Sequence, residues 1–347
     1  MKYDVTIGIP VYRSKAYIRQ ALESALLQSY PSIEFLIVDD AGEDGSMDIV
    51  RDLQITHQRG KDIRIITHHE NRGVSASRNL MIDEAKGEYL YFMDSDDVIA
   101  ENTISLMMQN IHQYKAEIVI GSYEKIELSG EKFVYRYPSL QLLETDALAS
   151  FAYRKYAGIQ ASACNYLVKT SLLRENHLQF VDTNYWEDMV FTFDLVTYIS
   201  RAILLPIITY TYLCRENSLS HYQQRHNIPK EEIMKNVAAV NYLKESSSLS
   251  YNKVYYPNRC YNIVMTDFYI ACHILKRRND IIPSISNHEI KTLMSHPATW
   301  EQICTFRHSR FKNLLLFMMG KLPSFLCVVV IWSLGKIKKL IQNLVVC

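Results

Sequence analysis

The chain has 347 residues, and with 48% hydrophobic and 22% charged residues its composition excludes a disordered or fibrous protein. Its 38 lysine and arginine residues balance 37 aspartate and glutamate residues, so the net charge of +1 excludes the strongly basic field that favours nucleic acid. The length suggests about two domains. Seven cysteines, an odd number without metal-ligand spacing, indicate free thiols in a reducing compartment. No secretion signal is visible at the N-terminus, and we therefore expect a cytoplasmic protein.

The first hundred residues alternate strand and helix patterns. The pattern predicts strands at residues 5–9 (ended by Pro10), 34–38, 63–66 and 89–93, and helices at residues 16–28, 47–53 (capped by Ser46) and 74–85. This alternation predicts an α/β fold with parallel βαβ units. Because ligands of such sheets bind at the carboxyl ends of the strands, we expect three segments to meet at one edge. They are residues 10–12, 39–40 and 94–97.

The pattern is less regular after residue 100. It predicts a helix at residues 102–114, a strand at 117–121, a hairpin at 123–136, a helix at 186–199 and a strand at 202–206. Residues 228–295 are mainly helical in pattern and contain no motif that we can assign. We expect a first domain over residues 1–220, a helical extension over 221–301 and a separate tail over 302–347.

The tail has no acidic residue but seven basic ones. These are Arg307, Arg310, Lys312, Lys321, Lys336, Lys338 and Lys339. Its apolar runs, residues 314–319 and 325–334, are shorter than the roughly 20 residues that span a bilayer. This composition predicts a helix on the surface of an anionic membrane. A pair of helices that completes a protein core is the alternative.

Two acidic motifs suggest chemistry. Three of the four residues 94–97 are aspartates that follow a strand, and a divalent magnesium or manganese ion would relieve their repulsion. The alternative is a solvated helix N-terminus, where carboxylates are favourable. Glu187 and Asp188 begin a helix and either complement its dipole or supply a general base.

Two further segments have a binding and a structural interpretation. Asp39 and Asp40 either accept a hydrogen bond from a nucleotide base or form a turn before Gly42. Residues 71–79 enter a helix at Gly73, where Arg78 either reaches a phosphate or lies at the surface. The glycine spacing differs from that of a P-loop or a dinucleotide fingerprint.

Taken together, these segments resemble the family-2 inverting glycosyltransferases of the GT-A fold, of the bacterial surface-polysaccharide type. The matching segments are residues 7–12, 28–30, 34–40, 71–79, 94–97 and 187–188, in the family's order over about residues 3–220. The resemblance implies a Rossmann-like three-layer sandwich with a mostly helical C-terminal extension. Arg13 and residues 41–42 depart mildly from the family pattern. The family's Tyr-Arg pair is displaced to Arg215, and the roles of Arg215 and His221 stay open.

The resemblance also implies a role for each matching residue. Asp188 would be the general base with Glu187 beside it, and Asp96 would hold Mn²⁺ or Mg²⁺ on the diphosphate. The residues expected to bind the nucleotide sugar are Pro10, Tyr12, Asp39, Asp40, Arg78, Asp94 and Ser95.

The implied activity is metal-assisted, inverting transfer of a sugar from a donor, usually UDP-linked, to a hydroxyl of a glycan or lipid-linked acceptor. The expected location is the inner face of the cell membrane, reached through the tail. A non-catalytic protein that binds sugar nucleotides is one alternative. A sugar-nucleotide pyrophosphorylase is less favoured, because the loop after the first strand is neither glycine-rich nor strongly basic.

Overall fold

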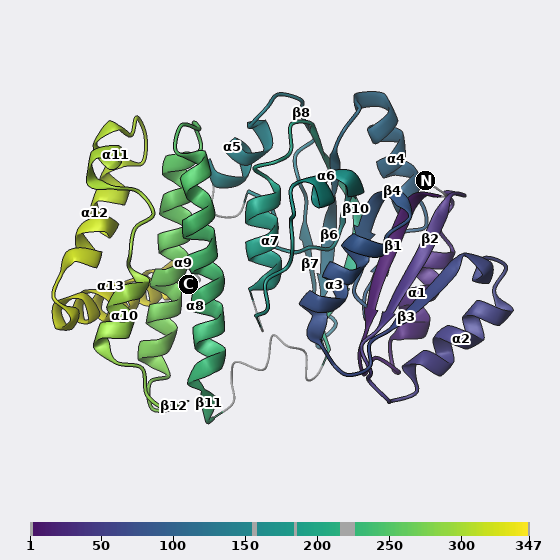
Figure 1. Ribbon diagram of the computed structural model, residues 1–347, viewed down its shortest axis with the longest axis horizontal. Helices are drawn as coiled ribbons and strands as arrows, with labels where there is room; N and C mark the ends of the chain where they lie inside the picture. The colour runs from purple at the N-terminus through teal and green to yellow at the C-terminus, as the bar shows by residue number, and fades with distance from the viewer. Residues whose placement is uncertain (1–2, 155–157, 184–185, 216–225, 346–347) are drawn as a thin grey trace. The chain divides into compact units, whose positions relative to one another are not determined.

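The chain divides into two compact units. The computed structural model describes residues 3–154, 158–183, 186–215 and 226–345. The first unit, here called the N-terminal unit, comprises residues 1–148, 161–182 and 187–221. The second, here called the helical unit, comprises residues 149–160, 183–186 and 222–347. Figure 1 labels the elements of both units.

A mixed sheet forms the centre of the N-terminal unit. Among the described residues it has ten strands, in the order β3-β2-β1-β4-β9-β6-β10-β5, with β7 beside β6 and β8 beside β10. The strands are β1 (Tyr3–Val11), β2 (Ile33–Asp39), β3 (Ile63–Thr67), β4 (Gly87–Phe92), β5 (Val98–Ile99), β6 (Ile118–Ile126), β7 (Lys132–Tyr135), β8 (Leu140–Leu142), β9 (Tyr166–Lys169) and β10 (Ala202–Leu213). Strands β1 to β4 run parallel to one another, whereas β9 is antiparallel to β4 and β6.

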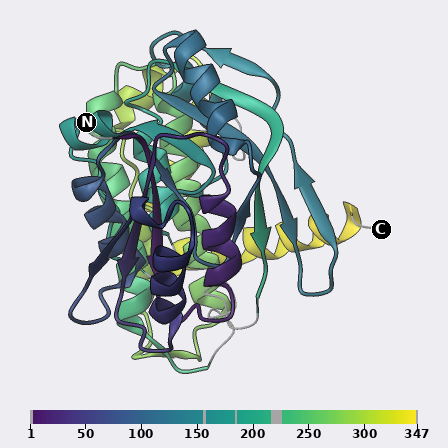
Figure 2. The same cartoon turned by 90° about the vertical axis from the view of Figure 1, so that its right-hand side faces the viewer.

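Helices cover both faces of this sheet (Figures 1 and 2). They are α1 (Ile18–Leu26), α2 (Ser46–Thr56), α3 (Gly73–Glu84), α4 (Thr103–Tyr114), α6 (Thr170–Glu175) and α7 (Glu187–Leu195). A glycine lets α3 approach the sheet closely, because a Cβ added at Gly8 of β1 would lie 2.7 Å from Met81 Sδ. The core consists of fully buried strand residues such as Ile7, Ile37 and Leu90.

Two local predictions were wrong. β1 does not end before Pro10 but continues to Val11. Its pairing with β4 stops at Gly8, so the proline has a paired strand on one side alone, as at a sheet edge. Ser46 is the first residue of α2, not its cap. The preceding residue is Gly45, whose φ of +86° suits glycine, and the Ser46 amide donates to Asp44 Oδ1 at 3.0 Å.

The helical unit contains most of the C-terminal part of the chain. Its elements are the end of α5 (Ala147–Arg154), β11 (Ile228–Pro229), α8 (Lys230–Ser246), α9 (Tyr256–Lys276), β12 (Ile281–Ile282), α10 (Asn287–Leu293), α11 (Trp300–Thr305), α12 (Arg310–Lys321) and α13 (Ser324–Val345). One core cluster joins Tyr256 and Cys260 of α9 to Ile303 and Phe306. The first residues of the predicted tail therefore belong to this core.

Buried polar groups of the helical unit are paired with one another. The Arg259 side chain donates to Ser247 Oγ at 2.8 Å and to the Tyr153 hydroxyl at 2.5 Å. Lys244 Nζ lies 2.5 Å from Asp267 Oδ2, at a carboxylate with no exposed surface. Burial raises the pKa of Asp267 to about 6 and Lys244 opposes this shift, so the Lys244–Asp267 contact joins α8 to α9 and offsets part of the cost of burying the carboxylate.

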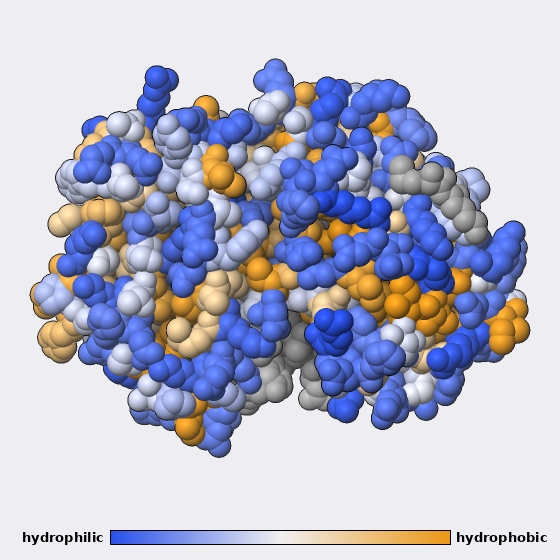
Figure 3. Space-filling model, viewed as in Figure 1, coloured by the Kyte–Doolittle hydropathy of each residue, from blue (hydrophilic) through white to orange (hydrophobic). Residues whose placement is uncertain are grey.

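The face in Figure 3 is mainly hydrophilic, with separate hydrophobic areas. In the described part of the chain, no helix is both long and apolar enough to cross a membrane. The six described cysteines are free thiols.

Candidate active site

Three strand ends meet at one edge of the parallel part of the sheet. Val11 at the end of β1 pairs with Asp39 at the end of β2, and the amide of Asp40 donates to Val11 O at 2.9 Å. On the other side of β1, the amide of Met93 donates to Gly8 O at 3.0 Å. The turn that follows β4, residues 94–97, therefore begins beside the ends of β1 and β2, as the sequence predicts.

The turn at residues 94–97 gathers three carboxylates. One oxygen each of Asp94, Asp96 and Asp97 lies within 4.8 Å of the others. Burial, and then the charge of Asp94, raises the pKa of Asp96 to about 6, although Arg215 opposes the shift. The same causes raise the pKa of Asp97 to about 8. Oxygen ligands at this spacing fit a hard divalent cation such as Mg²⁺ or Mn²⁺, which would relieve the repulsion.

Asp97 anchors this turn to β10. The Tyr210 hydroxyl donates to Asp97 Oδ2 at 2.6 Å, and the Leu213 amide donates to Asp97 Oδ1 at 2.9 Å. The side chain is almost completely buried. Both oxygens are thus engaged within the protein, and Asp97 holds the turn in place while Asp94 and Asp96 are more exposed. The sequence offers no signal for this role, because both partners follow more than 110 residues later.

Arg78 of α3 joins three carboxylates. Its Nη1 donates to Asp188 Oδ1 at 2.5 Å and lies 3.5 Å from Glu187 Oε1, and its Nη2 donates to Asp94 Oδ1 at 2.8 Å. The side chain is 3% exposed. Burial works to lower the pKa of Arg78, but Asp188 and Asp94 raise it well above its ordinary value. The guanidinium is therefore a permanent positive charge between the turn and α7.

Glu187 and Asp188 are the first two residues of α7. Burial, and then the charge of Asp188, raises the pKa of Glu187 to about 7, with Arg78 opposing. Burial also raises the pKa of Asp188, again opposed by Arg78. The Asp188 side chain is 22% exposed, against 11% for Glu187. Asp188 is thus the more accessible carboxylate, with a pKa shifted towards the range in which it can accept a proton.

Asp40 holds the loop before α3. Its Oδ1 accepts from the Arg72 amide at 2.8 Å and lies 2.8 Å from His68 Nδ1, while its Oδ2 accepts from the Gly73 amide at 2.9 Å. Asp39 Oδ1 accepts from the Ala41 amide at 3.1 Å in a local turn. These contacts give both aspartates a structural role, next to which their predicted role in base binding stays a prediction.

The remaining predicted residues border the same edge. Tyr12 follows β1, is 39% exposed and has the Arg13 guanidinium carbon 5.2 Å from its ring centroid. Pro10 is partly buried and Ser95 is buried. Arg215 Nε lies 2.5 Å from Asp96 Oδ2, whereas His221 lies outside the described residues. All ten predicted site residues thus lie in the N-terminal unit, on or beside this edge.

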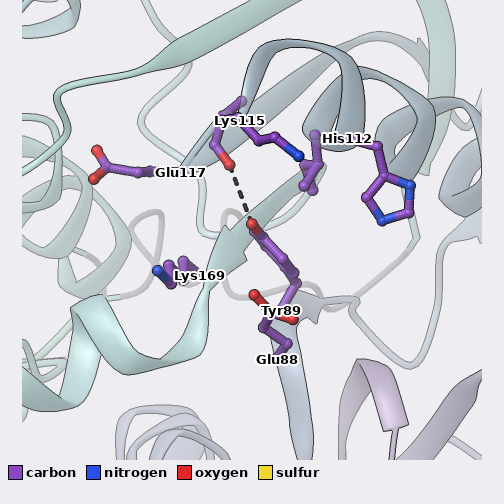
Figure 4. Close-up of a pocket in the computed structure, with 8 residues that line it drawn as sticks. Glu88, Tyr89, His112, Lys115, Glu117 and Lys169 are labelled. Carbon is purple, nitrogen blue, oxygen red and sulfur yellow. Dashed lines mark hydrogen bonds between the residues drawn. The ribbon is translucent and has the colours of Figure 1, made fainter.

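One cavity of the N-terminal unit lies elsewhere. It has a volume of about 300 Å³ and is found at the beginning of β4, at the opposite end of that strand from Asp94 (Figure 4). Lysines and glutamates of opposite charge line it, and the Tyr89 hydroxyl in its wall donates to Ala116 O at 3.3 Å. The cavity contains none of the predicted site residues.

A family model matches most of the N-terminal unit: residues 6–168 match Glycosyl transferase family 2. A segment of 132 residues is 33% identical to the glycosyltransferase GlyG of Streptococcus pneumoniae serotype 4. That alignment covers 38% of this chain and 42% of GlyG, so the match spans less than half of that relative's length.

Two solved structures share the fold. S. aureus TarS in complex with UDP-GlcNAc has a TM-score of 0.57 at 17% identity, over 91% of this chain and 90% of that one. The mannosyltransferase PcManGT from Pyrobaculum calidifontis, in complex with GDP-Man and Mn²⁺, has a TM-score of 0.53 at 16% identity, over 96% and 88%. The predicted α/β fold with a helical C-terminal part is confirmed.

Proposed function

We propose that the chain, whose residues 6–168 match the model of Glycosyl transferase family 2, transfers a sugar from a nucleotide diphosphate sugar to a hydroxyl group of a glycan or lipid-linked acceptor. One observation carries the proposal. Arg78 joins Asp94, in the turn of three carboxylates, to Asp188, the accessible carboxylate at the start of α7. The Arg78 side chain thereby fixes the proposed donor-binding carboxylate, Asp94, close to the proposed proton acceptor, Asp188.

The donor that we propose is UDP-linked. Its base would stack on Tyr12, with the backbone at Pro10 lining the pocket and Asp39 and Asp40 beneath. The partial exposure of Tyr12 leaves its ring accessible to such a ligand. The UDP-GlcNAc complex of TarS supports a UDP sugar, while the GDP-Man complex of PcManGT makes the base the feature to test first.

Asp96, with Asp94 beside it, would hold Mn²⁺ or Mg²⁺ on the diphosphate. Such an ion supplies positive charge where the departing diphosphate gains negative charge. The carboxylate spacing in the turn supports this assignment, as does the presence of Mn²⁺ in the PcManGT complex. Ser95 and Asp94 would lie against the ribose or the sugar.

Asp188 would accept the proton of the acceptor hydroxyl. Its ion pair with Arg78 fixes the carboxylate and favours its charged form, in which it can act as a base. A single displacement at the anomeric carbon needs one base and no nucleophile from the protein, and it inverts the configuration. Glu187, whose pKa is raised to about 7, would stay largely protonated below neutral pH beside it.

We propose that the protein works in the cytoplasm, on the inner face of the cell membrane, where a surface polysaccharide or its lipid-linked precursor is extended. Helix α13 supports membrane contact: it buries Cys327 and Ile331 on one face and exposes Phe325 (68%) and Trp332 (51%) on others. Lys336 Nζ lies 3.5 Å from the centroid of the Trp332 ring. Aromatic rings next to basic groups are typical of helices at an anionic membrane surface.

The test is donor binding and turnover with purified protein. UDP and GDP sugars are compared by thermal shift with and without Mn²⁺, and nucleoside diphosphate release is then measured with the best donor. We expect Mn²⁺-dependent stabilisation by a UDP sugar, lost in Asp96→Asn and kept in Asp48→Asn, a matched change at an 85% exposed side chain. Equal stabilisation of both variants would refute the metal assignment.

A further inference from the structure

Asp96 already has a cationic partner within the protein. Arg215 Nε lies 2.5 Å from Asp96 Oδ2, and their side chains are 27% and 17% exposed. The Arg215 guanidinium carbon also lies 5.2 Å from the ring centroid of Tyr17, at the start of α1. A pair that is largely shielded from water attracts more strongly than a surface pair, and this attraction opposes the burial that raises the pKa of Asp96 to about 6.

The position of Arg215 follows from β10. This strand ends at Leu213, whose amide donates to Asp97 Oδ1 at 2.9 Å. Tyr210 of the same strand donates to the other oxygen of Asp97. Arg215 comes two residues after Leu213, and the hydrogen bond of Leu213 to Asp97 therefore keeps Arg215 near the turn that contains Asp96. The end of β10 thus determines the position of the Arg215–Asp96 ion pair.

We propose that Arg215 and a divalent cation compete for Asp96, so that Arg215 neutralises the carboxylate until the cation binds and is then released towards the diphosphate of the donor. The inference rests on the proposed function, because it takes Asp96 as the metal ligand. A dication bound to Asp96 would lie within a few ångströms of the guanidinium, and the two positive charges would repel each other. A guanidinium is well suited to a diphosphate, to which it can donate two parallel hydrogen bonds.

The exchange gives Arg215 two effects of opposite sign. It weakens the binding of the metal alone, because the metal must first displace it. It strengthens the binding of the diphosphate once metal is present, because the released guanidinium gains a new partner. The site then binds metal and donor together more tightly than it binds metal alone. An arginine remote from the metal and the diphosphate would produce neither effect.

Arg215→Gln tests the exchange without any turnover. Binding of Mn²⁺ alone is followed by the loss of the electron paramagnetic resonance signal of the free ion, and binding of UDP at saturating Mn²⁺ by calorimetry. We expect Mn²⁺ affinity to rise about fivefold or more and UDP affinity to fall by at least as much, the usual size of a coupling between sites. Arg215→Lys, which keeps the charge, should lie between the variant and the wild type in Mn²⁺ affinity.

Arg51→Gln is the matched control, because it removes the same charge from an exposed position on α2 of the same unit. It should leave both affinities unchanged. Mn²⁺ affinity that is unchanged or lower in folded Arg215→Gln would overturn the exchange and leave the proposed function intact. Equal Mn²⁺ binding by wild type and Asp96→Asn would refute the metal assignment itself, and the exchange with it.

Discussion

Asp188→Asn separates a catalytic role of this residue from a structural one. The amide has nearly the same size and keeps an oxygen that can accept from Arg78, but it cannot accept a proton. Arg78 retains Asp94 at 2.8 Å, so the loss of one charge costs about 1 kcal/mol of stability, the difference between a charged and a neutral hydrogen bond. Loss of a general base costs roughly 100- to 10,000-fold in rate, or about 3–5 kcal/mol. The expected loss of rate therefore exceeds the expected loss of stability.

The assay compares turnover with donor affinity. We expect the turnover of Asp188→Asn to fall by at least about 100-fold while the dissociation constant for the UDP sugar in Mn²⁺ stays near the wild-type value. Asp48→Asn, on the exposed surface of α2, serves as the matched control and should retain full turnover. Turnover of Asp188→Asn within about tenfold of wild type would refute the assignment and make Glu187 the next candidate.

The described contacts support three further predictions. Arg78→Lys keeps the charge but loses the planar guanidinium that joins Asp94 to Asp188. The free energy of unfolding, measured by calorimetry, should fall by about 1–3 kcal/mol, and turnover should fall as well. An unfolding transition like that of the wild type would contradict a stabilising role for Arg78. The rate of transfer should fall as pH decreases, because Asp188 must be charged to act as a base. Burial raises the pKa of Asp188, so this fall should begin at a higher pH than it would for an ordinary aspartate. A pH–rate profile that is flat down to pH about 4 would contradict the role of Asp188 as the base. Phe325→Ser with Trp332→Ser should reduce binding to vesicles rich in phosphatidylglycerol, and Ile55→Ser, 82% exposed in the N-terminal unit, should not.

The tail prediction needs refinement in the light of the helical unit. Deletion of residues 302–347 would also remove Ile303 and Phe306, which pack against Tyr256 and Cys260. Such a truncated protein would lose part of a core as well as any membrane contact. Point changes on the exposed residues of α13 avoid this ambiguity, because they leave the buried Cys327 and Ile331 in place.

Much of the site could be predicted because parallel strands place their carboxyl ends together. Asp39, Asp40 and Asp94 each lie at or just after the end of a strand with a clear hydrophobic pattern, and that pattern alone brings them to one edge. The partners of Arg78 could not be derived in this way, since Asp188 lies 110 residues further along the chain and contact requires the complete fold. The antiparallel insertion of β9 between β4 and β6 was equally hidden, because short buried strands carry no signal of direction.

The cap of α2 shows a different limit. Serine before an apolar helix is a common start signal, yet here Asp44 accepts from the Ser46 amide and glycine supplies the left-handed residue between them. From the local sequence, Asp44 and Ser46 are equally plausible as the residue that accepts hydrogen bonds at the start of α2. The choice between them depends on the contact that Ser46 Oγ makes with the amide of Ser14, at 3.0 Å, from a distant part of the chain.

The single guanidinium shared by Asp94, Glu187 and Asp188 has a consequence for redesign. A protein engineer who alters Asp94 to change the accepted sugar would also change the electrostatic surroundings of Asp188 through Arg78. Substitutions at these positions should therefore be non-additive, and their combined effect has to be measured in double-mutant cycles rather than summed. If Asp94 and Asp188 have the roles proposed above, evolution faces the same constraint, because a change at either carboxylate alters the charge that Arg78 presents to the other.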